Sequence, residues 1–204
     1  MPYISIIILN WNGLDESQRC LKALFESNYP VKSWEVFLVD NGSEEKEGRI
    51  LKKQFPAIRL MESQNNLGFA GGNNLALAAL LKEGKADFAL TLNNDTVVDS
   101  NFLRELAVLA ENDSQIGAVA SKMLFYDQPK TIENVGHNLL VSGDIVPRGR
   151  GEAESLYASV VEVMGACAGA AFWRVKMLRQ IGLFREEFFA NYEDADLSLR
   201  GIVA

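Results

Sequence analysis

Short apolar runs alternate with amphipathic segments through the first half of the chain. Residues 4–9, 36–40, 58–61 and 86–92 are rich in β-branched and large apolar side chains. Such near-continuous apolar runs are typical of strands buried on both faces. Because segments with helical spacing separate these runs, the sequence predicts an α/β fold with a mixed, mostly parallel sheet and helices on both faces.

Four helices are expected between and after these strands. The first has Asp15 as its expected cap and Gln18 three residues later, and it ends before Pro30. The others are expected over residues 44–54, over residues 75–82, and from Ser100 or Asn101 onward.

The periodic pattern loosens after residue 116. Residues 118–120 and 160–163 have the composition of strands. Residues 128–157 are polar and rich in glycine, which predicts a mobile loop carrying Arg148 and Arg150. The chain shows no internal repeat, so one domain over residues 1–204 is expected.

Composition and charge narrow the function classes. The chain has 204 residues, is 48% hydrophobic, and carries a formal net charge of −7. An acidic balance argues against a nucleic-acid partner but not against nucleotides, which a metal and backbone amides can hold locally. Since no basic leader precedes the first apolar run and no run reaches the ~20 residues of a membrane-spanning helix, a cytoplasmic protein is expected, with peripheral membrane contact left open.

The two cysteines and the single histidine give little chemistry of their own. Cys20 and Cys167 are far apart in sequence and are expected to be reduced. One histidine, His137, argues against a Cys-His nucleophile and against a histidine-rich metal site. A lone histidine is more often structural, and that is the expectation for His137.

Polar clusters follow three of the predicted strands, at residues 10–12, 40–43 and 93–95. Because parallel neighbours end at one edge of a sheet, the three clusters are expected to meet in a ligand crevice, although each alone also has the composition of a turn. Trp11 either offers a stacking face for a base or packs at the sheet edge, and Asp40 either accepts from a base or ribose or forms an Asx turn with Asn41 and Gly42. Asp95 with its neighbouring amides suits Mg²⁺ or Mn²⁺.

Two nucleotide-binding classes are excluded by their motifs. A dinucleotide-binding dehydrogenase needs G-x-G-x-x-G after the first strand, where this chain has only Gly13. No G-x-x-x-x-G-K-[ST] occurs, which excludes a P-loop NTPase. The glycine- and asparagine-rich segment 65–74 stands before a predicted helix, where it suits a phosphate or a sugar, or forms a plain loop with a helix cap.

Three acids follow an aromatic run near the end of the chain. Glu193, Asp194 and Asp196 come directly after residues 188–192, which include three aromatic side chains. A carboxylate against an apolar wall can serve as a general base, whereas acids at a helix start are also common without function. Spacing alone does not choose between Glu193 and Asp194.

Taken in order, these segments resemble family 2 glycosyltransferases, and most closely the bacterial rhamnosyltransferase-like branch. The resemblance runs over essentially the whole chain. It rests on residues 6–12, 39–43, 66–74, 92–95 and 182–197 together with Arg200.

The resemblance implies a GT-A fold and an inverting transfer of a sugar, possibly rhamnose, from a nucleotide donor such as a dTDP- or UDP-sugar. The acceptor would be a hydroxyl of a glycan or a lipid-linked molecule in cell-surface polysaccharide synthesis. Residues 1–115 would be the nucleotide-binding half and residues 116–204 the acceptor-side half. The implied nucleotide and donor residues are Leu9, Trp11, Asp40, Asn66, Gly68, Gly72, Asn93 and Asn94.

The resemblance also implies a divalent metal, Mg²⁺ or Mn²⁺. Residues 93–95 occupy the place of the family's D-x-D motif, and Asp95 matches its metal-binding carboxylate. Asp194 matches the usual base, with Glu193 in support. Asn93 departs from the motif, which leaves one charge fewer for the metal.

Two further expectations concern the extent and the class of the protein. Relatives usually continue beyond the helix that carries Asp194, so a shortened chain of uncertain activity is expected. A nucleotide-sugar-binding module without turnover is one alternative. A sugar nucleotidyltransferase is another, but it would need a basic, glycine-rich loop after the first strand, and residues 10–13 do not form one.

Overall fold

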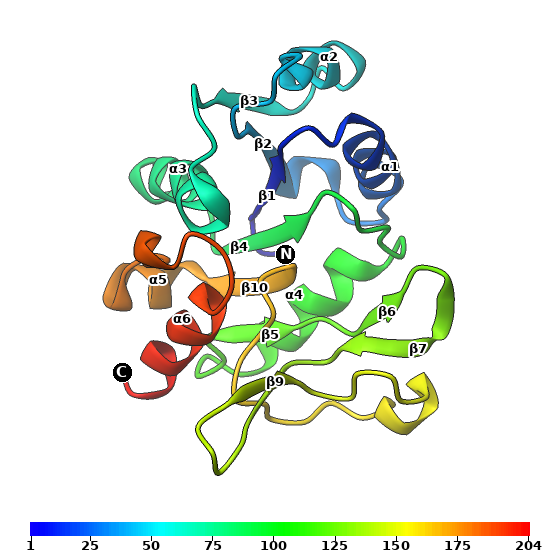
Figure 1. Ribbon diagram of the computed structural model, residues 1–204, viewed down its shortest axis with the longest axis vertical. Coiled ribbons are helices and arrows are strands. Elements are labelled where there is room, and N and C mark those ends of the chain that lie inside the picture. Colours follow the sequence, from blue (N-terminus) through cyan, green and yellow to red (C-terminus); the bar gives the residue numbers. More distant parts are fainter.

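The computed structural model describes residues 1–204 and is built around one six-stranded sheet (Figure 1). β3, β2, β1 and β4 are parallel neighbours, and β10 pairs antiparallel with β4 and β5. The predicted mixed, mostly parallel α/β sheet is therefore confirmed. In spatial order the strands are β3 (Arg59–Glu62), β2 (Trp34–Asp40), β1 (Ile4–Asn10), β4 (Phe88–Asn93), β10 (Ala170–Arg174) and β5 (Ala118–Ala120).

Helices cover both faces of the sheet, as the apolar strands require. Ile6 and Ile8 of β1 pack into a core with α1, α2 and α4, while Ile7 packs into a second core with α3, α5 and α6. Figure 1 shows α3, α5 and α6 grouped on one side of the sheet. No helix has the length and apolar character needed to cross a membrane. The helices are α1 (Leu14–Phe25), α2 (Glu47–Gln54), α3 (Gly68–Glu83), α4 (Phe102–Asn112), α5 (Val175–Ile181) and α6 (Glu193–Ile202).

The strand register brings the predicted polar clusters to one edge. Asn10 is paired with Asp40 at the ends of β1 and β2. Leu9 of β1 is paired with Asn93 at the end of β4. The expected convergence of the three clusters is thus confirmed by the sheet itself.

Three helix starts differ from the sequence expectation. α1 has Gly13 rather than Asp15 at its cap, and no side chain caps it. α2 begins at Glu47 because Lys46 has a left-handed backbone, with φ of 52°. α3 begins at Gly68 instead of residue 75, so most of the glycine-rich segment forms its first two turns. Glycine has a low helix propensity, but the close packing that these glycines allow at the start of α3 outweighs it.

The second half is more ordered than expected. Residues 128–157 are not one mobile loop but contain β7 (Gln128–Asn134), β8 (His137–Leu139), β9 (Ile145–Pro147) and a short 3₁₀ helix. β7 pairs with β6 (Met123–Phe125), and β8 pairs with β9. Residues 160–163 form no strand, whereas β10 was missed. Short hairpins with exposed side chains lack the apolar alternation from which strands are predicted.

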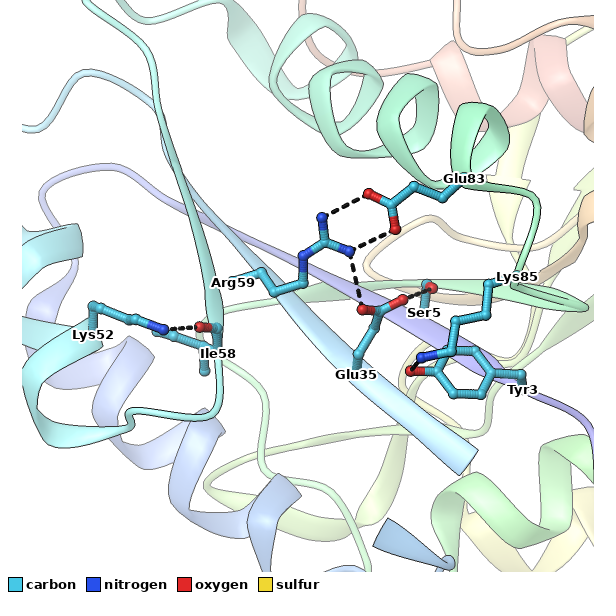
Figure 2. A network of polar contacts seen from close by, with 8 residues as sticks. All are labelled: Tyr3, Ser5, Glu35, Lys52, Ile58, Arg59, Glu83 and Lys85. Carbon is cyan, nitrogen blue, oxygen red and sulfur yellow. Dashed lines mark hydrogen bonds and ion pairs between the residues drawn. The ribbon is translucent and has the colours of Figure 1, made fainter. Parts of the chain in front are cut away.

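A polar network ties the edge strand β3 to the far end of α3 (Figure 2). Arg59 donates to both carboxylate oxygens of Glu83, at 2.7 and 2.6 Å, and to Glu35 at 3.1 Å. Its guanidinium also lies 4.3 Å from the centre of the Phe37 ring. Glu35 in turn accepts from Ser5 Oγ at 2.9 Å, so the network spans β1, β2, β3 and α3.

Replacing Arg59 with alanine is expected to lower the free energy of unfolding by about 1 kcal/mol, measured by urea denaturation. The effect is modest because the Arg59 side chain is 43% exposed. Arg19→Ala is the control, since Arg19 makes only an i,i+3 pair with Glu16 on α1 and should cost about 0.5 kcal/mol or less. Equal losses in the two variants would contradict a special role for the network.

Candidate functional site

Asn10 is the buried centre of the strand-end edge. Ser17 Oγ donates to Asn10 Oδ1 at 2.6 Å. Asn10 Nδ2 donates to Ser43 Oγ at 3.0 Å and to Glu47 Oε2 at 2.9 Å. The Gly13 N–H donates to the same Glu47 oxygen at 2.9 Å. These contacts join the loops after β1 and β2 to the starts of α1 and α2, so they fix this edge of the sheet in one arrangement.

Asp40 is buried at the end of β2, and both of its oxygens accept backbone hydrogen bonds. Oδ1 accepts from Ser43 N at 3.0 Å, and Oδ2 accepts from Gly48 N at 2.8 Å. A side chain at Gly48 would place its Cβ 2.7 Å from Asp40 Cβ. The turn role considered from the sequence is therefore present in the structure, and a contact between Asp40 and a base remains a prediction.

Asn41 connects the end of β2 to the glycine-rich start of α3. Its Nδ2 donates to Asn66 Oδ1 at 3.0 Å and to Gly68 O at 3.1 Å. Its Oδ1 accepts from Leu67 N at 3.1 Å. The sequence pattern around Asn41 predicts only a turn. Asn41 holds the segment that carries Asn66 and Gly68 against the sheet edge.

Trp11 and Leu9 present apolar surface at this edge. The Trp11 residue is 54% exposed, which leaves its indole free to stack on a ligand. Leu9 lies against Gly72 of α3, where any Cβ would clash with the Leu9 methyl groups. Gly72 is therefore needed for the close packing of α3 on β1, whatever it contributes to ligand binding.

The three residues that end β4 have different surroundings. Asn94 points to the start of α1, where its Nδ2 donates to Ser17 Oγ at 2.9 Å and to Gly13 O at 3.3 Å. The Asn93 carbonyl accepts from Thr96 Oγ1 at 2.7 Å. Asp95 is exposed and makes no hydrogen bond or ion pair with the protein. Of the three, only Asp95 has a side chain that is both charged and free to take a ligand.

Asp95 suits a divalent metal whose remaining ligands are phosphate oxygens and waters. Nowhere in the structure do three His, Cys, Asp or Glu side chains come together in a possible cation site. Mg²⁺ and Mn²⁺ nevertheless bind through one or two carboxylates when phosphate oxygens and waters complete the coordination. The free carboxylate of Asp95 fits that arrangement, and Asn93 adds no charge.

The aromatic segment before α6 rests on the start of α3. Ala70 N donates to Phe189 O at 3.1 Å, and a side chain at Gly68 would clash with Phe189. Phe189, Asn191 and Tyr192 have positive φ values of 56°, 73° and 68°. Side chains rarely adopt this backbone region, and such strain concentrates at functional sites. The glycine-rich segment at the start of α3 and the acidic segment at the start of α6 are therefore neighbours.

Glu193 is the first residue of α6, and its residue is only 5% exposed. Its Oε2 is buried without a hydrogen-bond partner. Burial, followed by the charge of Asp194, raises the pKa of Glu193 from 4.5 to about 7. A carboxyl group with such a pKa is poised to exchange a proton at neutral pH.

Asp194 lies beside Glu193 but is held in the opposite state. Its Oδ2 accepts from Ala168 N at 2.9 Å, and its Oδ1 accepts from Ala195 N at 2.7 Å. His137 Nε2 is 3.3 Å from Oδ2. Burial alone would raise the pKa of Asp194, but His137 and these backbone amides outweigh it and hold the pKa below its usual range. Asp194 is therefore ionised at neutral pH.

One short loop joins the two parts of the site. Asn93 N donates to Gly169 O at 2.8 Å, and the preceding Ala168 donates to Asp194. The end of β4, with Asp95, and the start of α6, with Asp194, are thereby fixed to consecutive residues. Both ends carry site residues expected from the sequence, but the link between them could not be predicted because a small apolar loop has no distinctive pattern.

The sheet order and this edge define a GT-A-type fold. A mannosyltransferase from Pyrobaculum calidifontis in complex with GDP-Man and Mn²⁺ matches 96% of this chain with a TM-score of 0.65 and 18% identity. TarS from S. aureus in complex with UDP-GlcNAc matches 98% of this chain with a TM-score of 0.68 and 18% identity. The chain belongs to glycosyl transferase family 2, whose sequence profile matches residues 5–182.

Curated relatives come from the archaeon Haloferax volcanii, so they do not support the bacterial branch in particular. The low-salt glycan biosynthesis hexosyltransferase Agl10 is 25% identical over 199 residues, which is 97% of this chain and 61% of Agl10. The glycosyltransferase AglE is 40% identical over 45 residues, 22% of this chain and 15% of AglE. The chain also spans 50% of the mannosyltransferase structure and 53% of the TarS structure.

Proposed function

We propose that this chain carries the catalytic site of an inverting, metal-dependent glycosyltransferase that moves a hexosyl group from a nucleotide sugar to an acceptor hydroxyl. The main support is a pair of hydrogen bonds to the consecutive residues Ala168 and Gly169. They connect the segment with the free carboxylate of Asp95 to the segment with the acids Glu193 and Asp194. A single displacement needs a metal ligand and a proton acceptor near each other, and this loop connects the segments that carry them.

The donor is proposed to lie along the edge formed by residues 1–115. Leu9, Trp11 and Asp40 are assigned to the nucleoside. The mannosyltransferase of similar fold is bound to GDP-Man, and TarS is bound to UDP-GlcNAc. The relative Agl10 is a hexosyltransferase of glycan biosynthesis. These likenesses support a hexose donor. The resemblance also implies a rhamnosyl donor, and dTDP-rhamnose is therefore tested beside the hexose donors. The remaining assigned donor residues are Asn66, Gly68, Gly72, Asn93 and Asn94.

Asp95 is proposed as the protein ligand of Mg²⁺ or Mn²⁺. When bound, such a metal stabilises the negative charge that develops on the departing diphosphate. Asn94 holds the turn by its bonds to Ser17 and Gly13, which keeps Asp95 at the mouth of the crevice. The Mn²⁺ in the mannosyltransferase complex supports this assignment.

Asp194 is proposed to take the proton of the acceptor hydroxyl, with Glu193 in support. Its lowered pKa keeps Asp194 ionised, and its fixed contacts to Ala168 and Ala195 hold it in one orientation. Residues 116–204 are assigned to the acceptor, a glycan or a lipid-linked molecule. The exposed rings of Phe189 and Tyr192 offer a surface beside the base. Placement in the cytoplasm, with peripheral contact at the membrane, fits a lipid-linked acceptor.

The proposed metal site predicts that Asp95→Ala removes the gain in nucleotide affinity that Mn²⁺ provides. Calorimetry with GDP, UDP and dTDP, with and without Mn²⁺, is the measurement, and a loss of about tenfold or more is expected because no second carboxylate takes over. Asp127→Ala is the matched control, since Asp127 is an exposed acid without a partner. A Mn²⁺-dependent gain that survives Asp95→Ala would contradict the metal assignment.

A donor screen tests the function as a whole. GDP-mannose, UDP-GlcNAc, UDP-glucose and dTDP-rhamnose are incubated with Mn²⁺, and the released nucleotide is identified. Release of a nucleoside diphosphate supports glycosyl transfer. In a parallel incubation with added pyrophosphate, formation of a nucleoside triphosphate and a sugar 1-phosphate would instead identify a nucleotidyltransferase. Tight binding without any release, in this chain and in a form as long as its relatives, would identify a binding module.

A further inference from the structure

His137 is a buried side chain for which the proposed function has no role. It begins β8, and its residue is 7% exposed. Its backbone N–H donates to Gly165 O at 2.8 Å, which fixes the strand against the loop that carries Ala168. Gly165 is itself in close contact with Ser198 of α6, because a Cβ there would lie 2.5 Å from Ser198 Cβ. The imidazole is thus enclosed between the hairpin, the loop and α6.

Asp194 is the acid that lies within ion-pair distance of the ring. His137 Nε2 and Asp194 Oδ2 are 3.3 Å apart, which is within ion-pair distance, although the contact does not have the geometry of a full hydrogen bond. Neither ring nitrogen has another hydrogen-bond partner. Buried polar groups are nearly always paired, so the interaction with Asp194 is the one that accounts for this histidine.

We propose that His137 is a positioning residue for Asp194: its imidazole holds the carboxylate in the orientation from which Asp194 takes the acceptor proton. This inference rests on the proposed function. Asp194 already accepts from Ala168 and Ala195, one amide on each oxygen. The imidazole adds a third contact from a different element, which leaves the carboxylate little freedom to turn.

The electrostatic setting shows why the third contact matters. The titratable groups around this pair are Glu193 from α6 and Cys167 from the loop, and Glu133 of β7, which is paired with Arg150, acts on Cys167. Burial disfavours the ionised form of Asp194. A histidine beside Asp194 opposes that effect, and its contribution is among the largest of those that lower the pKa of Asp194.

Kinetics provide the first test. Nucleoside diphosphate release from UDP-GlcNAc or GDP-mannose is followed with Mn²⁺ for His137→Ala and His137→Gln. We expect His137→Ala to lower kcat by about 10- to 100-fold with the donor KM within twofold, as for other residues that orient a reacting group. His137→Gln, whose amide can donate toward Oδ2, should recover part of the loss.

The pH profile separates positioning from a merely structural role. Without the imidazole the pKa of Asp194 rises, so the acid limb of the kcat profile should move to higher pH in His137→Ala. An equal loss of kcat at every pH, with an unchanged limb and unfolding at lower urea concentration, would show that His137 only supports the fold and would overturn the proposal.

A second measurement does not depend on turnover. His137 is the only histidine, so its ring gives one set of imidazole signals in the nuclear magnetic resonance spectrum. Asp194→Asn should shift the ring ¹H and ¹⁵N signals at pH 7, whereas Glu187→Gln, the same charge change at an exposed acid without a partner, should leave them in place. Unmoved signals in Asp194→Asn would overturn the pairing. If no nucleotide sugar is turned over but the signals move, the pairing stands and the proposed function fails.

Discussion

Asp194→Asn is expected to lower turnover by about 10²- to 10⁴-fold, the usual contribution of a general base. The reason is chemical. An amide cannot accept the hydroxyl proton, and the neighbouring backbone N–H groups of Ala168 and Ala195 leave no other acceptor at that position. Initial rates of nucleoside diphosphate release, measured at saturating donor with the active nucleotide sugar, test this expectation.

The control for Asp194→Asn is nucleotide binding. Asp95, Asn94 and the glycine-rich start of α3 do not contact Asp194 directly, so the Mn²⁺-dependent affinity for UDP or GDP should change by less than about threefold. Thermal unfolding checks that the fold is kept. Turnover that persists in Asp194→Asn but is abolished in Glu193→Gln would transfer the role of base to Glu193.

The sheet was predictable because its strands are buried on both faces. A run such as residues 4–9 is apolar on both faces, which favours a central parallel strand, and β1 does pair in parallel with β2 and β4. The meeting of Asn10, Asp40 and Asn93 at one edge then follows from parallel pairing alone. Family resemblance added roles that this pairing does not supply.

Other parts of the site depend on contacts between distant segments. β10 is buried at residues 170–173, yet its five residues follow a loop of glycine and alanine that gives no periodic signal. The link from Asn93 to Asp194 passes through that same loop. His137 stands on a three-residue strand that is mostly exposed after its first residue, so no local pattern marks it as a neighbour of Asp194.

The opposite pKa shifts of Glu193 and Asp194 also could not be predicted from the sequence. Glu193 and Asp194 are adjacent, but backbone N–H groups bond both oxygens of Asp194, whereas Oε2 of the buried Glu193 has no partner. Adjacent residues on a helix point in different directions, and the surrounding elements decide which carboxylate is stabilised. That difference gives a second large effect.

Glu193→Gln is expected to stabilise the fold by about 3 kcal/mol at pH 8.5. Burial raises the pKa of Glu193 from 4.5 to about 7, so between these values the native state binds a proton that the unfolded state has lost. The free energy of unfolding of the unsubstituted protein therefore falls as the pH rises through this window, by about 1.4 kcal/mol per pH unit. Glutamine carries no charge, so the variant does not lose this stability. Urea unfolding of both proteins at pH 8.5 and pH 5 measures the difference.

The pH dependence makes this prediction specific to the buried carboxylate. At pH 5 Glu193 is largely protonated in the native state, so Glu193→Gln should have a much smaller effect there, while Glu187→Gln at an exposed position should change stability little at either pH. A stabilisation of equal size at both pH values would point to packing instead of ionisation. If Glu193→Gln gains stability at pH 8.5 while turnover falls, the unfavourable burial of Glu193 is retained because the chemistry of Asp194 needs that carboxyl group beside it.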